Sequence, residues 1–145
     1  MKLAITGKGG VGKTTLSALL AQTYADQGRD VLAVDADPSP CLAGALGFPP
    51  EIRAQLHPIA EMDELIEERT GAKPGTVGGF FTLNPRVDDI PERFSIRHRG
   101  VRLLEMGSVD LGGSGCICPE SAMLKTLFTH LLFRKDDILL LDMYA

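Results

Sequence analysis

The sequence predicts an α/β fold built on a doubly wound, mostly parallel sheet with helices on both faces. The first observation behind this prediction is a strand, a helix and a second strand within about 35 residues, the usual size of a βαβ unit. The second is that the apolar runs expected as strands do not alternate with polar residues, which is typical of strands covered on both faces. The third is a glycine-rich loop at residues 7–14, between the first strand and the first helix. Open α/β sheets bind ligands at such connections, so this loop is the first candidate site.

The N-terminal third of the chain supplies the first three elements. Residues 2–6 form a short apolar strand that stops at the glycine-rich loop. Residues 13–27 carry leucines at helical spacing, and Gly28 follows where helices commonly end on a glycine. Residues 31–34 are the second strand, which leads directly into Asp-Ala-Asp-Pro. These elements make up the expected βαβ unit.

The middle of the chain is less regular. We expect a helical turn at residues 42–46, a charged helix at residues 59–70 and a loop at residues 73–79. Apolar runs at residues 80–83 and 101–106 predict two further strands.

The last predicted elements are a helix and a buried strand. The helix begins at Pro119, because proline suits the first helical position, where its missing N–H group would be unpaired anyway. The strand covers residues 138–141 and ends at Asp142, three residues before the end of the chain. We therefore expect residues 1–145 to be a single, incomplete domain, the N-terminal portion of a larger fold whose later strands and helices are missing.

Composition narrows the classes of function. A chain of 145 residues buries enough surface to fold without a disulfide or a metal. Its net charge of -4 argues against non-specific binding of nucleic acid. It contains neither an apolar run of the ~20 residues that a membrane span needs nor a signal-peptide pattern. We expect a cytoplasmic protein without a nucleic-acid or membrane partner, whose three cysteines are thiols or metal ligands.

A complete G-x-x-x-x-G-K-[ST] motif defines the glycine-rich loop. It consists of Gly7, Lys8, Gly9, Gly10, Val11, Gly12, Lys13 and Thr14, and Thr15 follows within the predicted nucleotide site. Glycines let successive N–H groups point at a phosphate, and the next helix adds the positive end of its dipole. Lys13 is expected to reach the terminal phosphates and Thr14 to place its hydroxyl on Mg²⁺. The motif predicts a P-loop NTPase that binds ATP with Mg²⁺.

Lys8 adds a feature that an ordinary phosphate loop does not specify. The run Lys-Gly-Gly-Val-Gly-Lys-Thr-Thr resembles the deviant Walker A motif of the MinD/ParA and nitrogenase iron protein class. The resemblance implies that Lys8 reaches the phosphates held by the partner chain of a nucleotide-sandwich dimer, and it makes Lys8 a catalytic candidate beside Lys13. The plainer alternative is an exposed lysine next to an anion site.

Three aspartates complete the predicted nucleotide site. Asp37 matches the switch I aspartate of that class, and a carboxylate there can orient the attacking water. Asp35 is a candidate to hold Mg²⁺ through water. Asp142 has the form of a Walker B aspartate, with a strand-ending cap as the alternative. Because the loop, Asp37 and Asp142 follow three different strands, we expect them to meet at one edge of the sheet.

A cysteine pair precedes the last helix. Cys116 and Cys118 supply two thiols, whereas a closed tetrahedral zinc site needs four ligands. A two-fold dimer would place the same loop opposite itself and bring four thiols together. The alternative for a lone C-x-C pair is two small, half-buried residues.

In combination, these motifs resemble the CooC-type carbon monoxide dehydrogenase accessory ATPases, which insert nickel, and the likeness runs from Met1 to Ala145. The resemblance implies hydrolysis of ATP to ADP and phosphate, a homodimer formed on nucleotide and metal binding, and Ni²⁺ or Zn²⁺ on Cys116 and Cys118. It also implies that carbon monoxide dehydrogenase or a related nickel enzyme is the client. Tyr144 departs from that family, which has a small residue there. Two other readings stay open: an iron–sulfur ATPase-reductase of the nitrogenase iron protein type, and a positioning ATPase of the MinD/ParA type.

Overall fold

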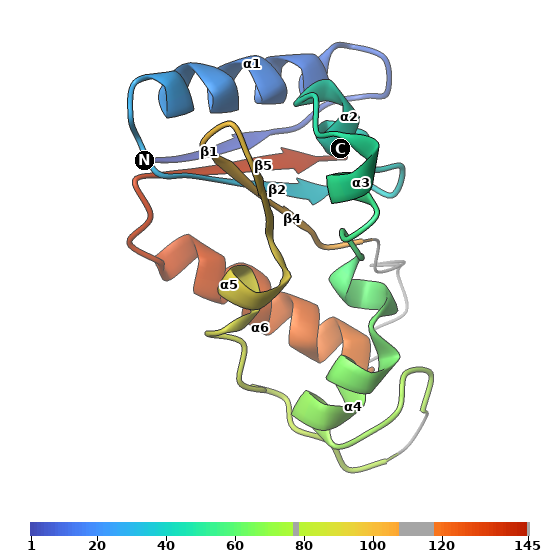
Figure 1. Cartoon of the computed structure of the whole chain (residues 1–145). Helices are drawn as coiled ribbons and strands as arrows, with labels where there is room; N and C mark the ends of the chain where they lie inside the picture. The colour runs from blue at the N-terminus through green and yellow to red at the C-terminus, as the bar shows by residue number, and fades with distance from the viewer. Residues whose placement is uncertain (77–78, 108–117, 145) are drawn as a thin grey trace.

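A computed structural model of the chain describes residues 1–76, 79–107 and 118–144 (Figure 1). Within these residues it contains five strands, seven helices counting one 3₁₀ turn, and one sheet. The strands are β1 (Lys2–Ile5), β2 (Val31–Ala36), β3 (Ile96–His98), β4 (Val101–Glu105) and β5 (Ile138–Met143). The helices are α1 (Lys13–Asp26), α2 (Leu42–Ala45), α3 (Pro50–Arg53), the 3₁₀ turn η1 (Ile59–Glu61), α4 (Asp63–Thr70), α5 (Ile90–Phe94) and α6 (Pro119–Phe133).

The sheet has the strand order β1-β5-β2-β4-β3. All neighbours are parallel except β3, which pairs with β4 in the antiparallel direction. β2, the second strand of the first βαβ unit, lies at the centre of the sheet between β5 and β4. The carboxyl ends of β1, β5, β2 and β4 therefore lie at one edge, as the sequence predicted.

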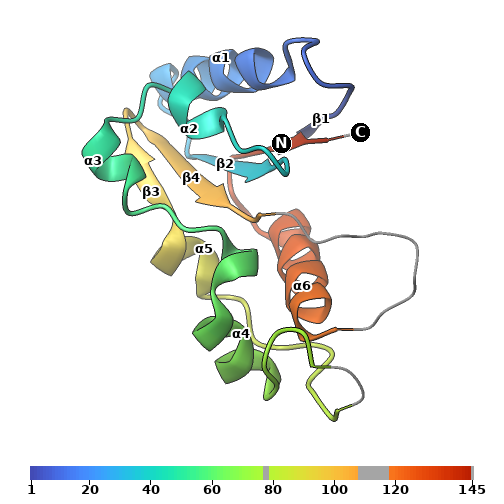
Figure 2. The same ribbon diagram turned by 90° about the vertical axis from the view of Figure 1, so that its right-hand side faces the viewer.

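Helices lie on both faces of the sheet (Figure 2), and a separate hydrophobic core lies on each face. Along β2, Leu32 and Val34 belong to the core under α4 and α6, whereas Val31 and Ala33 belong to the core under α1 and α2. All four side chains are fully buried. This two-sided burial is the physical reason for the unalternated apolar pattern, and it confirms the doubly wound α/β class.

The strand predicted at residues 80–83 is wrong. Phe80 is fully exposed there, and the outer strand of the sheet is formed instead by β3. A tight turn at Arg99 (φ 48°) and Gly100 (φ 80°) folds β3 back onto β4. Positive φ at both central residues is the geometry that connects twisted antiparallel strands. This turn, and not an apolar run, therefore determines which segment pairs with β4. The helix predicted at residues 59–70 is also divided, into η1 and α4.

An ion-pair cluster joins the amino-terminal ends of the strands, at the edge opposite the phosphate loop. Arg102 of β4 is only 5% exposed, and its guanidinium donates to Asp30 (2.6 Å), Glu92 (2.9 Å) and Asp136 (3.0 Å). Arg134, just after α6, donates to Asp136 (2.8 Å) and Glu92 (2.6 Å). The cluster ties β4, the start of β2, α5 and the turn before β5 together.

Candidate functional site

The phosphate loop connects β1 to α1. Gly10 (φ 78°) and Gly12 (φ 89°) have the left-handed backbone that favours glycine. Gly12 caps α1 without a side-chain hydrogen bond, and the first turn of α1 contains no acidic residue. Thr14 is half-buried in that turn, while Lys8 and Thr15 are exposed. The loop itself holds Gly7, Lys8, Gly9, Gly10, Val11 and Gly12. Its backbone leaves the amino-terminal N–H groups of a 14-residue helix available to an anion.

Lys13 lies where the loop, the segment after β2 and the end of β5 meet. The side chain is largely buried, and its ammonium donates to the backbone oxygen of Lys8 at 3.3 Å. It lies 3.8 Å from the Asp37 carboxylate and 5.8 Å from the centre of the Tyr144 ring. The structure thus brings two predicted site residues, Lys13 and Asp37, together. An ammonium in this position can pair with a phosphate or, as here, with protein oxygens.

Asp142 is the buried carboxylate of the site. It is 1% exposed, and it is in register with Ile5 of β1 and Asp35 of β2. Neither of its oxygens has a hydrogen-bond partner among the residues that the structure describes. Burying a carboxylate that accepts no hydrogen bond costs free energy. A bound cation next to Asp142 would offset this cost. A carboxylate oxygen is the kind of hard ligand that Mg²⁺ takes, so the chemistry of Asp142 fits Mg²⁺. Thr14, half-buried in the first turn of α1, stays the other predicted ligand.

Asp35 organises the turn that carries Asp37. One carboxylate oxygen accepts the Asp37 N–H (3.2 Å), and the other accepts those of Cys41 (3.1 Å) and Leu42 (2.9 Å). Burial raises the pKa of Asp35, these backbone hydrogen bonds oppose the rise, and the neighbouring charge of Asp142 adds to it. Asp35 is thus a support for the Asp37 turn, and its contact with Mg²⁺ stays a prediction.

Two polar residues at this edge were missed by the sequence analysis. Glu105 ends β4 in register with Asp35, so three adjacent strands place carboxylates in one row. Burial raises the pKa of Glu105, and the charge of Asp35 raises it further. Ser17 lies one turn after Lys13 in α1, fully buried, with no partner for its hydroxyl in the described parts of the chain. Neither residue belongs to a motif, and only the strand register and the packing of α1 reveal them.

Only one of the two predicted metal-binding cysteines lies within the described residues. Cys116 lies outside the described residues. Cys118 is half-buried at the start of α6, where its thiol donates to the Ser121 hydroxyl at 3.0 Å. Within residues 1–76, 79–107 and 118–144 there is no group of three or more His, Cys, Asp or Glu side chains that could hold a metal ion. No helix in the same ranges is both long and apolar enough to cross a membrane.

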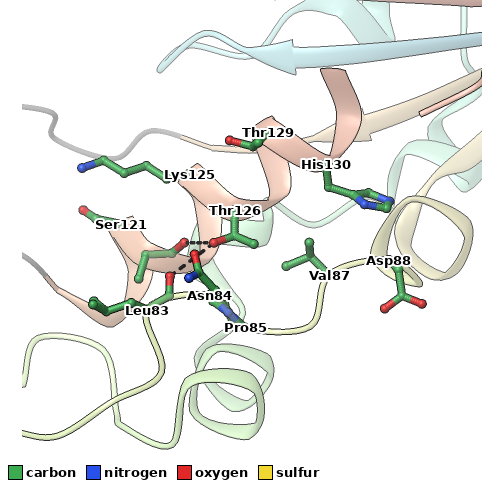
Figure 3. A pocket seen from close by; sticks show the side chains of 11 residues that line it. Leu83, Asn84, Pro85, Val87, Asp88, Ser121, Lys125, Thr126, Thr129 and His130 are labelled. Atoms are coloured by element: carbon green, nitrogen blue, oxygen red, sulfur yellow. Dashed lines mark hydrogen bonds between the residues drawn. The ribbon is translucent and has the colours of Figure 1, made fainter. Parts of the chain in front are cut away.

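A cavity of about 610 Å³ lies elsewhere, between α6 and the segment at residues 83–88 (Figure 3). Thr126 of α6 donates across it to the Leu83 carbonyl at 3.4 Å. Lys125 and His130 are among the side chains that line it, and none of the predicted nucleotide-site residues does so. The cavity is therefore separate from the phosphate loop.

Comparison with known proteins finds relatives along the whole chain. The chain is 52% identical over 145 residues to the carbon monoxide dehydrogenase accessory protein CooC of Rhodospirillum rubrum, covering all of this chain and 55% of that protein. It is 46% identical, with the same coverage, to an uncharacterized ATP-binding protein of Methanocaldococcus jannaschii. The chain thus spans about half the length of these curated relatives. A plasmid partition protein from Borrelia burgdorferi shares the fold, with a TM-score of 0.53 at 19% identity over 98% of this chain and 54% of that one.

The family follows from a match that covers nearly the whole chain. Residues 2–141 match the CobQ/CobB/MinD/ParA nucleotide binding domain, a range that includes the phosphate loop, the Asp37 turn and most of β5. The parallel sheet and the glycine loop at the start of α1 agree with this match. The chain belongs to the CobQ/CobB/MinD/ParA nucleotide-binding domain family.

Proposed function

We propose that this chain is the nucleotide-binding part of an ATP-hydrolysing accessory protein that delivers Ni²⁺ or Zn²⁺ to carbon monoxide dehydrogenase or a related nickel enzyme. The observation that carries the proposal is the likeness, along the whole chain, to the Rhodospirillum rubrum accessory protein. The C-x-C pair supports metal as the cargo and favours this reading over a positioning ATPase, which has no use for two such thiols.

The residues of the site suggest how ATP is handled. The loop amides and the α1 N-terminus bind the phosphates, and Lys13 exchanges the Lys8 carbonyl and the Asp37 carboxylate for the terminal phosphates. Asp37, released from that contact, orients the attacking water. Mg²⁺, held by Thr14 and Asp142, would neutralise charge on the phosphates. Lys8 reaches the nucleotide of a second chain, which makes the dimer the hydrolytic form.

Binding of the metal ion depends on the same dimer. Two chains together contribute Cys116 and Cys118 twice, which gives the four thiolates of a closed tetrahedral site. A metal that binds only the dimer stabilises it, and nucleotide that stabilises the dimer raises metal affinity by the same factor. Hydrolysis, by weakening the dimer, releases the metal.

Native mass spectrometry with a non-hydrolysable Mg-ATP analogue and stoichiometric Ni²⁺ or Zn²⁺ tests the metal proposal. We expect a dimer with two nucleotides and one metal ion. The variant Cys116→Ser/Cys118→Ser should keep the nucleotide and lose the metal, whereas the exposed-cysteine control Cys41→Ser should keep both. Metal retained by the double variant would refute the cysteine site, and bound iron with acid-labile sulfide would favour the iron–sulfur reductase instead.

Asp142→Asn is expected to stabilise the ligand-free chain and to damage its function. Removing a buried charge that has no donor in the described part of the chain should raise the free energy of unfolding by about 1 kcal/mol, whereas Mg²⁺ should no longer strengthen ATP binding. Urea unfolding measures the first effect, and ATP titration calorimetry with and without Mg²⁺ measures the second. Loss of stability with unchanged Mg²⁺ dependence would assign Asp142 a purely structural role.

A further inference from the structure

Tyr144 follows the interior strand β5, at the edge of the sheet that holds the phosphate loop. The last paired positions of β5 and β2 are Met143 and Ala36, so Tyr144 and Asp37 come next on neighbouring strands. On its other side β5 pairs with β1, the strand that leads into the loop. Figure 2 shows the end of β5 on the same side of the molecule as the connection from β1 to α1. Tyr144 therefore lies beside the place where the loop would hold phosphate.

The aromatic ring of Tyr144 lies next to the ammonium of Lys13. Nζ of Lys13 is 5.8 Å from the ring centre, which is within the range of a cation–π interaction. The Asp37 carboxylate and the Lys8 carbonyl oxygen lie 3.8 Å and 3.3 Å from the same ammonium. The Lys13 side chain is only 7% exposed, and a cation–π interaction strengthens as its cation loses water. In the ligand-free chain the ring thus helps to hold the charge that a phosphate would need.

Packing holds this ring only weakly. Tyr144 is 59% exposed, and it belongs to neither of the two hydrophobic cores that the described residues form. The free energy gained by burying an apolar side chain scales with the area removed from water, so a ring this exposed gains little from burial. The ring can therefore move away when another group binds the Lys13 ammonium.

We propose that Tyr144 determines how strongly the site prefers a nucleoside triphosphate to a diphosphate, because its ring competes with the terminal phosphate for Lys13. This inference rests on the proposed role of Lys13 in nucleotide binding. In a phosphate loop the backbone N–H groups hold the α- and β-phosphates, and the third phosphate extends past them towards the lysine. The face of an aromatic ring carries partial negative charge, which attracts an ammonium and repels a phosphate oxygen. A triphosphate must displace the ring, whereas a diphosphate can leave it in place.

Titration calorimetry of Tyr144→Leu with Mg-ADP and with a non-hydrolysable Mg-ATP analogue tests this role. Leucine keeps an apolar side chain and removes the aromatic face. We expect the affinity for the ATP analogue to rise about three- to tenfold and the affinity for Mg-ADP to change by less than about twofold. Tyr144→Phe retains the ring and should bind both nucleotides as the wild-type chain does. Tyr24→Phe is the matched control, since the Tyr24 hydroxyl contacts the sulfur of Met1 and not the loop.

Tyrosine fluorescence gives a second readout that does not depend on affinity. The chain has two tyrosines and no tryptophan, so in the Tyr24→Phe variant all tyrosine emission comes from Tyr144. Saturation with the ATP analogue should change this emission as the ring leaves Lys13. Saturation with Mg-ADP should leave it nearly unchanged.

Three results would overturn the proposal. One is a Tyr144→Leu variant whose affinities for the two nucleotides are unchanged or change equally. Another is a Tyr144→Phe variant that behaves like Tyr144→Leu, which would assign the effect to the hydroxyl and not to the ring. These two results would leave nucleotide binding by the chain intact. The third is failure of both the wild-type chain and Tyr144→Leu to bind either nucleotide, which would also refute the proposed function.

Discussion

Lys13→Ala is expected to lower the affinity of the chain for Mg-ATP at least about 100-fold, or ~2.7 kcal/mol of binding free energy. Lys13 is the largely buried ammonium of the loop, and charge-assisted hydrogen bonds to phosphate are the strongest that such a site makes. In the ligand-free chain its contacts are long, at 3.3 Å and 3.8 Å, so the free energy of unfolding should change little. Titration calorimetry measures the affinity, and urea unfolding confirms that the variant is folded.

Lys8→Ala is the matched control for this experiment. Lys8 is exposed, and its contact with Lys13 uses its backbone oxygen, which alanine retains. A single chain with this substitution should bind Mg-ATP normally, and hydrolysis by a dimer should fall. Equal loss of affinity in both variants would contradict the assignment of Lys13 to the bound phosphates and of Lys8 to the partner's nucleotide.

Arg102→Ala is expected to destabilise the chain by about 1.5–3 kcal/mol, because it removes charge-assisted hydrogen bonds to three carboxylates, one of which is buried. The Asp136 side chain is 5% exposed and would keep only Arg134 as a partner. The exposed pair of Arg86 and Asp88 provides the control, since Arg86→Ala should change stability by no more than about 0.5 kcal/mol. Urea unfolding at pH 7 compares the two variants. Equal losses of stability would show that the cluster contributes no more to the free energy of unfolding than an exposed ion pair does.

Lowering the pH should reduce the difference in the free energy of unfolding between the Arg102→Ala variant and the wild-type chain. Burial acts to raise the pKa of Asp136, but hydrogen bonds from Arg134 and Arg102 outweigh it, so the pKa lies below its ordinary value. A carboxylate with a lowered pKa contributes stability above its unfolded pKa of about 3.9, and this contribution is lost as the pH falls toward the folded pKa. Repeating the urea titrations between pH 7 and pH 3 measures this dependence.

The sequence predicted the parts of the fold that local pattern determines. Continuous apolar runs identified the parallel strands, and the glycine loop located the start of α1. The antiparallel strand β3 was missed because a two-residue turn, Arg99–Gly100, places it, and its three residues carry little pattern of their own. The division of residues 59–70 into η1 and α4 was also missed, because the non-helical backbone of Met62 separates the two segments and the residue pattern of the run gives no sign of a break.

The sequence named the residues of the predicted nucleotide site but not the contacts between them. The motifs named Lys13, Asp37 and Asp142. The structure brings Lys13 and Asp37 together, and within its described residues it gives the buried carboxylate of Asp142 no donor. No sequence motif predicts that Asp35 accepts hydrogen bonds from three backbone N–H groups, or that Glu105 of β4 is in register with it. Those facts depend on strand pairing and on the path of the chain after β2. The role of Cys116 stays a prediction.

The division of the interior into two cores has an evolutionary consequence. The clusters on the two faces of the sheet share no residue, so changes in one should be nearly additive with changes in the other. α1, which carries Lys13, packs on one side, and α6, which begins next to Cys118, packs on the opposite side. Mutations that reshape the α6 side can therefore accumulate without disturbing the frame of the phosphate loop. A lineage with this architecture is able to vary the α6 side of the sheet while conserving the phosphate loop and the helix that follows it.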